Sequence, residues 1–198
     1  MHETEHFWAD EFGDDYTIRN MGRVKNNIGL FAKIARYMDD PETVLEFGAG
    51  AGENIKAMQS IWPDALYHAV EINSVACMKL AEIENIMVNC DSIYTAQMPR
   101  ADLVLTKGLL IHIPPEHIEE AYAKIYEHAR KYILLCEYYN PTLVVVPYRG
   151  HAGRLWKRDF AGDMLDKYRD LRLVEYGFIY NRDNLPQDDI TWFLLEKY

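Results

Sequence analysis

The sequence lacks the features that mark membrane proteins, secreted proteins and general nucleic-acid binders. No apolar run approaches the ~20 residues that a membrane-spanning helix needs, and the N-terminus is polar and acidic where a signal peptide would be apolar. The 198 residues carry 21 lysines and arginines against 31 aspartates and glutamates, a net charge of −10. Because broad nucleic-acid binding relies on basic surface, we expect neither a membrane nor a nucleic acid as partner.

Cysteine is scarce as well. Cys77, Cys90 and Cys136 are odd in number, far apart and each in an apolar segment, which predicts buried, reduced thiols in a cytoplasmic protein. The sequence has no internal repeat, low-complexity tract or linker. Since its length suits one domain with a sizeable core, we expect a single domain over residues 1–198, as a monomer or homodimer.

No metal centre is expected, although residues 2–6 match the H-E-x-x-H pattern of zinc proteases. The match lies at the extreme terminus, where helices fray. It has no apolar flank to hold it rigid and no evident third ligand. We interpret it as the solvated acidic start of a polar, loop-like lead-in, residues 1–22, whose aromatic side chains could cover a pocket.

One stretch organises the rest of the chain. The apolar run 44–47 contains Glu46, and glycines follow at positions 48, 50 and 52 before a predicted helix. Glycines let a ligand approach the backbone closely, and the first N–H groups of the helix would face that ligand. A dinucleotide-binding turn needs its third glycine at position 53, where the chain has Glu53. A glycine-rich turn without any ligand remains an alternative.

Four more apolar segments alternate with helical patterns, and two strands with a polar loop between them follow. This order predicts a three-layer, doubly wound α/β fold of Rossmann-like type, with a mostly parallel sheet closed by an antiparallel pair. The predicted strands after the first are Leu66–Glu71, Ile86–Cys90, Asp102–Thr106, Tyr132–Glu137, Leu171–Tyr180 and Ile190–Glu196.

Polar residues follow each of the five parallel strands. Right-handed crossovers place all the carboxyl ends of these strands on one rim, where ligands of open α/β sheets bind. Glu71 lies where a carboxylate can accept hydrogen bonds from both ribose hydroxyls of a nucleoside. Asp91 could accept from an adenine amino group or could be a turn residue. The residues brought to the rim are Glu46, Gly48, Glu71, Asp91, Lys107, His112, Tyr139 and Asn140.

A long insertion, residues 138–160, interrupts the pattern after the fifth strand, and its aromatic and branched side chains favour an ordered structure. Its basic residues could bind an anionic small molecule, because guanidinium groups pair with carboxylates and phosphates. They could equally pair with nearby acids such as Asp159. The candidate substrate-binding residues here and at its start are Tyr139, Asn140, Tyr148, Arg149, His151 and Arg154.

The chain resembles class I S-adenosylmethionine-dependent methyltransferases in its acid-x-G-x-G-x-G turn and strand order. More narrowly, it resembles the methylases associated with pseudaminic acid biosynthesis, in residues 7–20, 44–58, 107–118, 137–164 and 190–197. The resemblance implies seven strands with the last antiparallel, a helical cap over residues 1–40, and S-adenosylmethionine as cofactor. The implied cofactor-binding residues are Tyr16, Arg19, Glu46, Gly48, Ala49, Gly50, Glu71, Ile72, Asp91, Ser92, Ile93 and Lys107. For Arg19, a surface ion pair with Asp14 or Asp15 is the alternative.

The resemblance predicts methyl transfer to a small anionic acceptor, such as an acidic sugar or sugar nucleotide. His112 is then the candidate base, because an imidazole titrates near neutral pH; a structural histidine bonded to a loop carbonyl is the alternative. A non-catalytic cofactor-binding module and a methyltransferase of protein or nucleobase amino groups stay open. The latter often carries N-P-P-Y after the fourth strand, where residues 106–109 read Thr-Lys-Gly-Leu.

Overall fold

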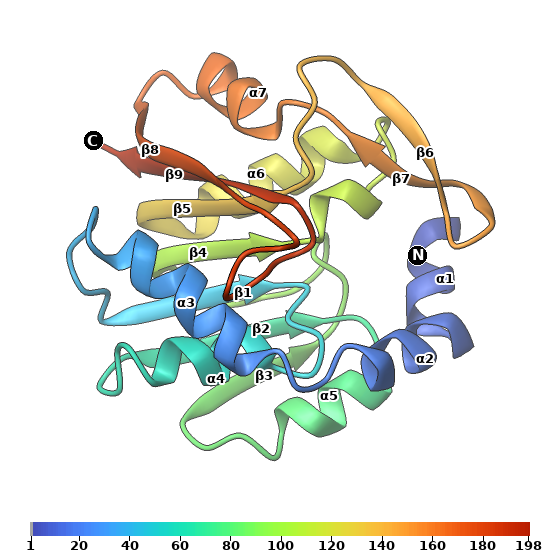
Figure 1. Cartoon of the computed structure of the whole chain (residues 1–198), viewed down its shortest axis with the longest axis horizontal. Helices are drawn as coiled ribbons and strands as arrows, with labels where there is room; N and C mark the ends of the chain where they lie inside the picture. Colours follow the sequence, from blue (N-terminus) through green and yellow to red (C-terminus); the bar gives the residue numbers. More distant parts are fainter. Residues whose placement is uncertain (1) are drawn as a thin grey trace.

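The computed structural model describes residues 2–198, which form a seven-stranded sheet in the order β3-β2-β1-β4-β5-β9-β8 (Figure 1). Strand β9 runs antiparallel to both of its neighbours, whereas the pairs among β1 to β5 are parallel. The strands are β1 (Thr43–Phe47), β2 (Leu66–Glu71), β3 (Ile86–Cys90), β4 (Ala101–Lys107), β5 (Ala129–Glu137), β8 (Leu171–Ile179) and β9 (Ile190–Lys197).

Helices cover both faces of the sheet and enclose two apolar cores (Figure 1). Helices α3 (Val24–Ala35), α4 (Glu53–Gln59) and α5 (Ser74–Leu80) bury Phe31, Met58 and Leu80 on one face. Helices α6 (Ile118–His128) and α7 (Phe160–Lys167) bury Tyr122 and Met164 on the other. The predicted three-layer Rossmann-like fold, mostly parallel and with an antiparallel last strand, is confirmed.

The N-terminal segment differs from the loop-like lead-in expected from its residues, whereas the family resemblance implied helices there. Residues 3–19 form two helices, α1 (Glu3–Ala9) and α2 (Glu11–Arg19), and Thr4 is buried. Apolar rings stabilise them, since Trp8 packs edge to face against both Phe12 and Tyr16. The prediction of a solvated terminus was wrong, because it counted the acids and overlooked aromatic residues at four-residue spacing.

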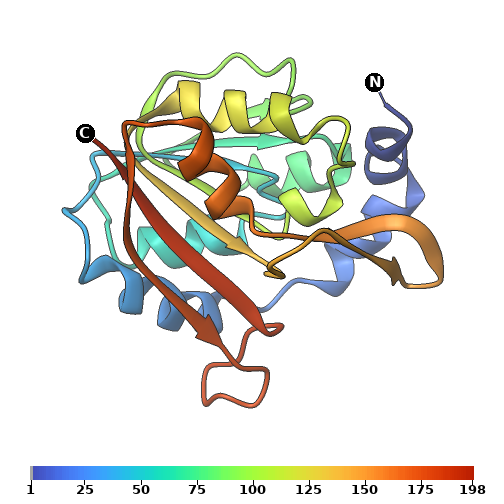
Figure 2. The same cartoon turned by 90° about the horizontal axis from the view of Figure 1, so that it is seen from above.

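The insertion 138–160 is ordered, as predicted, and forms a separate two-stranded hairpin of β6 (Val144–Tyr148) and β7 (His151–Lys157). Figures 1 and 2 show the hairpin projecting beyond the sheet and lying beside α1. Arg154 of β7 pairs with Glu3 of α1 at 2.5 Å and lies over the Phe7 ring. The hairpin therefore holds the N-terminal helices against the rim of the sheet.

The cysteines correct a second prediction. Cys77 of α5 and Cys90 at the end of β3 form a disulfide, and only Cys136 is a buried free thiol. The two cysteines are 13 residues apart in sequence, so their pairing was not expected. The connection from α5 to β3 turns the chain back and brings Cys90 beside Cys77. The cytoplasmic location was inferred from three reduced thiols, and the disulfide removes that support. Among the described residues, no helix is long and apolar enough to cross a bilayer.

Candidate active site

The glycine-rich turn is held open by Glu71. Gly48 and Gly50 have φ values of 72° and 54°, a region that favours glycine. The Gly50 N–H donates to Glu71 Oε2 at 2.7 Å, and the N–H groups of Ile72 and Asn73 donate to Oε1 at 2.9 Å. Burial raises the pKa of Glu71, and these three hydrogen bonds oppose that rise. A Cβ at Gly50 would project into open space, so the turn leaves room for a ligand.

A first cavity of about 140 Å³ lies beside this turn, between the sheet rim and the helices α1 and α2. It gathers most of the predicted cofactor-binding residues from the ends of four strands. Trp8 also lines it, and the indole N–H of Trp8 is buried with no hydrogen-bond partner in residues 2–198. The predicted residues that line this cavity are Tyr16, Gly48, Gly50, Glu71, Ile72, Asp91, Ser92, Ile93, Lys107 and His112.

A second cavity of about 430 Å³ adjoins the first and extends toward the hairpin and the β8–β9 connection. Tyr148 and Arg149 of the hairpin line it, as does the predicted cofactor residue Ala49. Arg23 lines it too and pairs with Asp188 at 2.5 Å. The walls thus combine aromatic rings with charges of both signs.

The two cavities meet at a shared border on the rim. Residues from α2, the glycine-rich turn and the end of β4 line both of them: Tyr16, Thr17, Gly48, Gly50, Lys107, Gly108 and His112. Lys107 is partly exposed there, and burial lowers the pKa of its ammonium group. A molecule in one cavity can therefore contact a molecule in the other at this border.

His112 ends a single 3₁₀ turn, η1 (Leu110–His112), at the border. Its Nδ1 lies 2.7 Å from the carbonyl oxygen of Arg154; since a carbonyl only accepts, Nδ1 carries the hydrogen and Nε2 keeps a lone pair. Burial lowers the pKa of His112 to about 4, so the ring is neutral at physiological pH. The bond to a backbone carbonyl, one of the two uses that the sequence left open, is present, although the carbonyl lies in strand β7. The expectation that the ring titrates near neutral pH was wrong, because burial lowers its pKa. A role of His112 as a base stays a prediction.

Glu137, which sequence reasoning overlooked, positions this turn. Its buried carboxylate accepts the N–H groups of Leu109 and Leu110 at 3.2 and 3.1 Å. Burial raises the pKa of Glu137 to about 7. Like Glu46 and Glu71 it is an acid at a strand end, and that signal was sufficient to find it.

Six predicted site residues line neither cavity, and one of them, Glu46, is described separately below. Arg19 pairs with Asp15 at 3.6 Å, and Arg154 is engaged by Glu3. The other three lie on the outside of the hairpin or at its base: Tyr139, Asn140 and His151. The hairpin turns its tip residues 148 and 149 toward the cavity, whereas His151 and the Arg154 side chain face α1 or solvent. A role for these residues in binding stays a prediction.

Glu46 also lies behind the cavities rather than on their walls. It is fully buried, and its Oε1 accepts the Asn54 side-chain N–H at 2.6 Å. Its Oε2 has no hydrogen-bond partner among the described residues. Burial raises the pKa of Glu46 to about 8. Glu46 therefore ties β1 to α4 beneath the glycine-rich turn.

Sequence reasoning also missed Trp8, Arg23 and Tyr138, which line the cavities. Trp8 had a usable signal, its four-residue spacing from Phe12 and Tyr16. Tyr138 directly follows β5, so its strand-end position was a usable signal. Arg23 had none, because its partner Asp188 is distant in sequence.

Solved structures that share this fold include several methyltransferases. The 1,6-didemethyltoxoflavin-N1-methyltransferase of Burkholderia thailandensis, with its substrate and S-adenosylhomocysteine bound, matches with a TM-score of 0.71 at 13% identity, over 98% of this chain and 86% of that one. The magnesium protoporphyrin IX methyltransferase of Synechocystis, with bound S-adenosylmethionine, matches with a TM-score of 0.68 at 13% identity, over 100% and 99%.

The plantazolicin methyltransferase BpumL, in complex with S-adenosylhomocysteine, matches with a TM-score of 0.69 at 11% identity, over 98% of this chain and 93% of that one. No protein-family profile matches the sequence, and no curated protein matches it significantly. At 11–13% sequence identity, these matches show that the fold is shared. The chain therefore has the Rossmann-like fold of S-adenosylmethionine-dependent methyltransferases.

Proposed function

We propose that the protein is a methyltransferase that binds S-adenosylmethionine in the first cavity and a small-molecule acceptor in the second. One observation carries the proposal: two separate cavities share a border at the strand-end rim. A donor and an acceptor can thus be held in contact. Because positioning alone supplies a large share of the rate of such bimolecular reactions, this arrangement suits group transfer.

The first cavity fits the proposed cofactor in its chemistry. Glu71 offers carboxylate oxygens to ribose hydroxyls, and the Trp8 indole N–H is a buried donor without a partner in residues 2–198. The open space at Gly50 allows close approach to the backbone. When bound, the cofactor supplies an activated methyl group. Asp91 and Ser92 at the end of β3 would hold the adenine end.

The second cavity would orient the acceptor. His112 Nε2 is placed to accept a hydrogen bond, and then the proton, from an acceptor hydroxyl or amine. Glu137 and the Arg154 carbonyl keep the ring in place. Each of these residues acts on position or on a proton, which is all that the protein must add to an activated methyl group.

The finer proposal is an acceptor that carries an anionic group, such as an acidic sugar or sugar nucleotide. Its support is Arg149, which lies at the cavity over the Tyr148 ring and makes no ion pair within the described chain. In this reading residues 1–198 are one domain, with 1–40 as a cap and 138–160 as the acceptor-binding insertion.

Calorimetry with S-adenosylhomocysteine tests the cofactor site. Wild-type protein should bind one molecule, and Glu71→Ala should weaken binding by roughly 100-fold or more, because it removes the carboxylate that orders the turn and faces the cavity. Glu84→Ala, an exposed acid remote from both cavities, is the matched control. Equal affinity of all three proteins would refute the site.

Isotope transfer from labelled S-adenosylmethionine tests the acceptor. A panel of small acceptors with and without carboxylate or phosphate groups should show transfer to anionic members, and Arg149→Ala should raise KM for them. Arg182→Ala, exposed in the β8–β9 connection, is the control. Cofactor binding without transfer to any acceptor would favour a non-catalytic module.

A further inference from the structure

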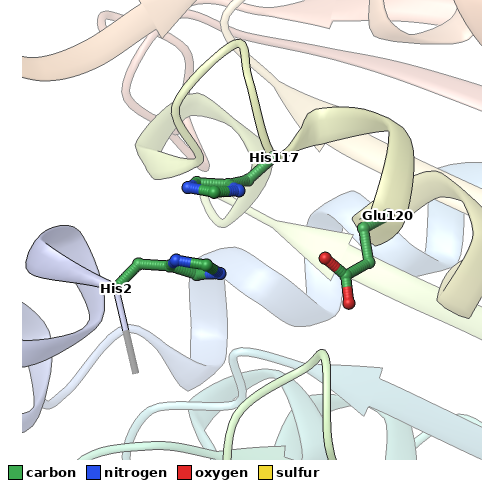
Figure 3. Close-up of side chains that lie close together, drawn as sticks. All are labelled: His2, His117 and Glu120. Atoms are coloured by element: carbon green, nitrogen blue, oxygen red, sulfur yellow. The ribbon is translucent and has the colours of Figure 1, made fainter.

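Three potential metal ligands meet at the outer edge of the first cavity: His2, His117 and Glu120. Their ligand atoms all lie within 4.8 Å of one another. Figure 3 shows the two imidazole rings facing each other and the Glu120 carboxylate beside them. The rings are stacked with centroids 3.6 Å apart. His2 and His117 also line the first cavity, so the cluster belongs to its rim.

We propose that this cluster binds a divalent transition-metal ion of the Zn²⁺ class. Two imidazoles and one carboxylate are a ligand set that Zn²⁺ accepts, with a fourth position left for water. Bonds of about 2.1 Å in a tetrahedral site put ligand atoms roughly 3.4 Å apart. The present spacing therefore needs an inward movement of about an ångström, which rotation of surface side chains can supply.

The groups are available for this role. Across residues 2–198, neither the His117 ring nor the Glu120 carboxylate makes a hydrogen bond or ion pair with another side chain. The backbone of His2 is anchored, because its N–H donates to Glu5 Oε2 at 2.5 Å and the Ser92 hydroxyl donates to Glu5 Oε1. The His2 ring is thus held near α6 before any metal binds.

The cluster explains why the H-E-x-x-H match at residues 2–6 is misleading. His6 is exposed and outside the cluster, and Glu3 pairs with Arg154. The partners of His2 come from the start of α6 instead. The ion would therefore join α1 to α6 across the edge of the first cavity and clamp the N-terminal helix over it.

Titration of untagged protein with Zn²⁺ alone, against a chromogenic chelator and without cofactor, tests the site. Wild type should bind one ion per chain, and His117→Ala and Glu120→Gln should each weaken binding roughly tenfold or more, the scale of damage to a metal site. His6→Ala and Glu116→Gln are exposed neighbours and should bind as wild type does. Absence of stoichiometric binding, or equal affinity of all variants, would overturn the proposal.

Hydrogen exchange tests the clamp separately. Zn²⁺ should slow amide hydrogen exchange in Glu3–Ala9 of the wild-type protein. The same amides in the Glu120→Gln variant should exchange at the same rate with and without Zn²⁺. Unchanged exchange in wild type with the ion bound would overturn the clamp. Since neither measurement uses cofactor or acceptor, failure here is distinguishable from failure of the proposed methyl transfer.

Discussion

Glu46 makes the stability of the protein depend on pH. Its carboxyl group is fully buried, and burial raises its pKa from an ordinary 4.5 to about 8. The folded protein thus keeps a proton on Glu46 that the unfolded chain has released. The stability associated with this proton is complete below about pH 4.5 and is lost as the pH rises through about 8.

We expect Glu46→Gln to flatten that fall between pH 7 and 8, because the amide stays neutral. One proton over one pH unit corresponds to about 1.4 kcal/mol, so the effect between pH 7 and 8 is at most about 1.4 kcal/mol. Glu137, whose pKa is about 7, maintains the slope below that pH. Denaturant unfolding at a series of pH values measures how the free energy of unfolding depends on pH. Glu42→Gln, at an exposed position, is the control. An unchanged slope in Glu46→Gln would contradict the assignment.

If His112 is the base, its replacement should affect turnover more than binding. Replacing it with Asn removes the free Nε2 at the border of the cavities, and we expect kcat to fall by about 100-fold, the low end for general-base groups. Affinity for S-adenosylhomocysteine should change little. His128→Asn is the matched control, because His128 Nδ1 also lies 2.7 Å from a backbone carbonyl. Initial rates of methyl transfer measure the effect, and equal loss in both variants would count against a role in proton transfer.

At the scale of helices and strands, the sequence predicted the sheet better than its attachments. Strands 66–71 and 86–90 match β2 and β3 in their bounds, because apolar parallel strands are determined by local composition. The local interpretation of residues 1–22 missed helices α1 and α2, because it overlooked the four-residue spacing of Trp8, Phe12 and Tyr16. The contacts of Trp8 with His112 and Tyr148 could not be predicted, because these partners are distant in sequence. Pairing of Cys77 with Cys90 likewise depends on how α5 returns to the sheet.

The disulfide joins α5 to β3 and should stabilise that connection. Closing a loop of 13 residues is worth roughly 3 kcal/mol in the chain-entropy account. We therefore expect reductant to lower the free energy of unfolding of wild type by about that amount. A Cys77→Ala/Cys90→Ala variant should unfold alike with and without reductant. Insensitivity of wild type to reductant would mean that the bond does not form.

For the whole molecule, the site has two parts of different origin. The rim of the sheet follows from topology, so convergence of Gly48, Glu71, Asp91 and Lys107 could be predicted from strand order alone. The cover over that rim could not, because it depends on contacts between segments far apart in sequence, such as Arg154 with Glu3. The cavities therefore exist only in the assembled protein.

This division predicts that the cover can be removed without unfolding the sheet. No residue of α1 or α2 belongs to either apolar core, so a protein lacking residues 2–20 should still unfold cooperatively. It should lose the stabilisation by S-adenosylhomocysteine that wild type gains, about 2.7 kcal/mol at a hundredfold excess over Kd, because Trp8, Tyr16 and Thr17 leave the cavity walls. Thermal unfolding with and without ligand measures both. Full stabilisation of the shortened protein would show that the sheet rim binds the cofactor unaided.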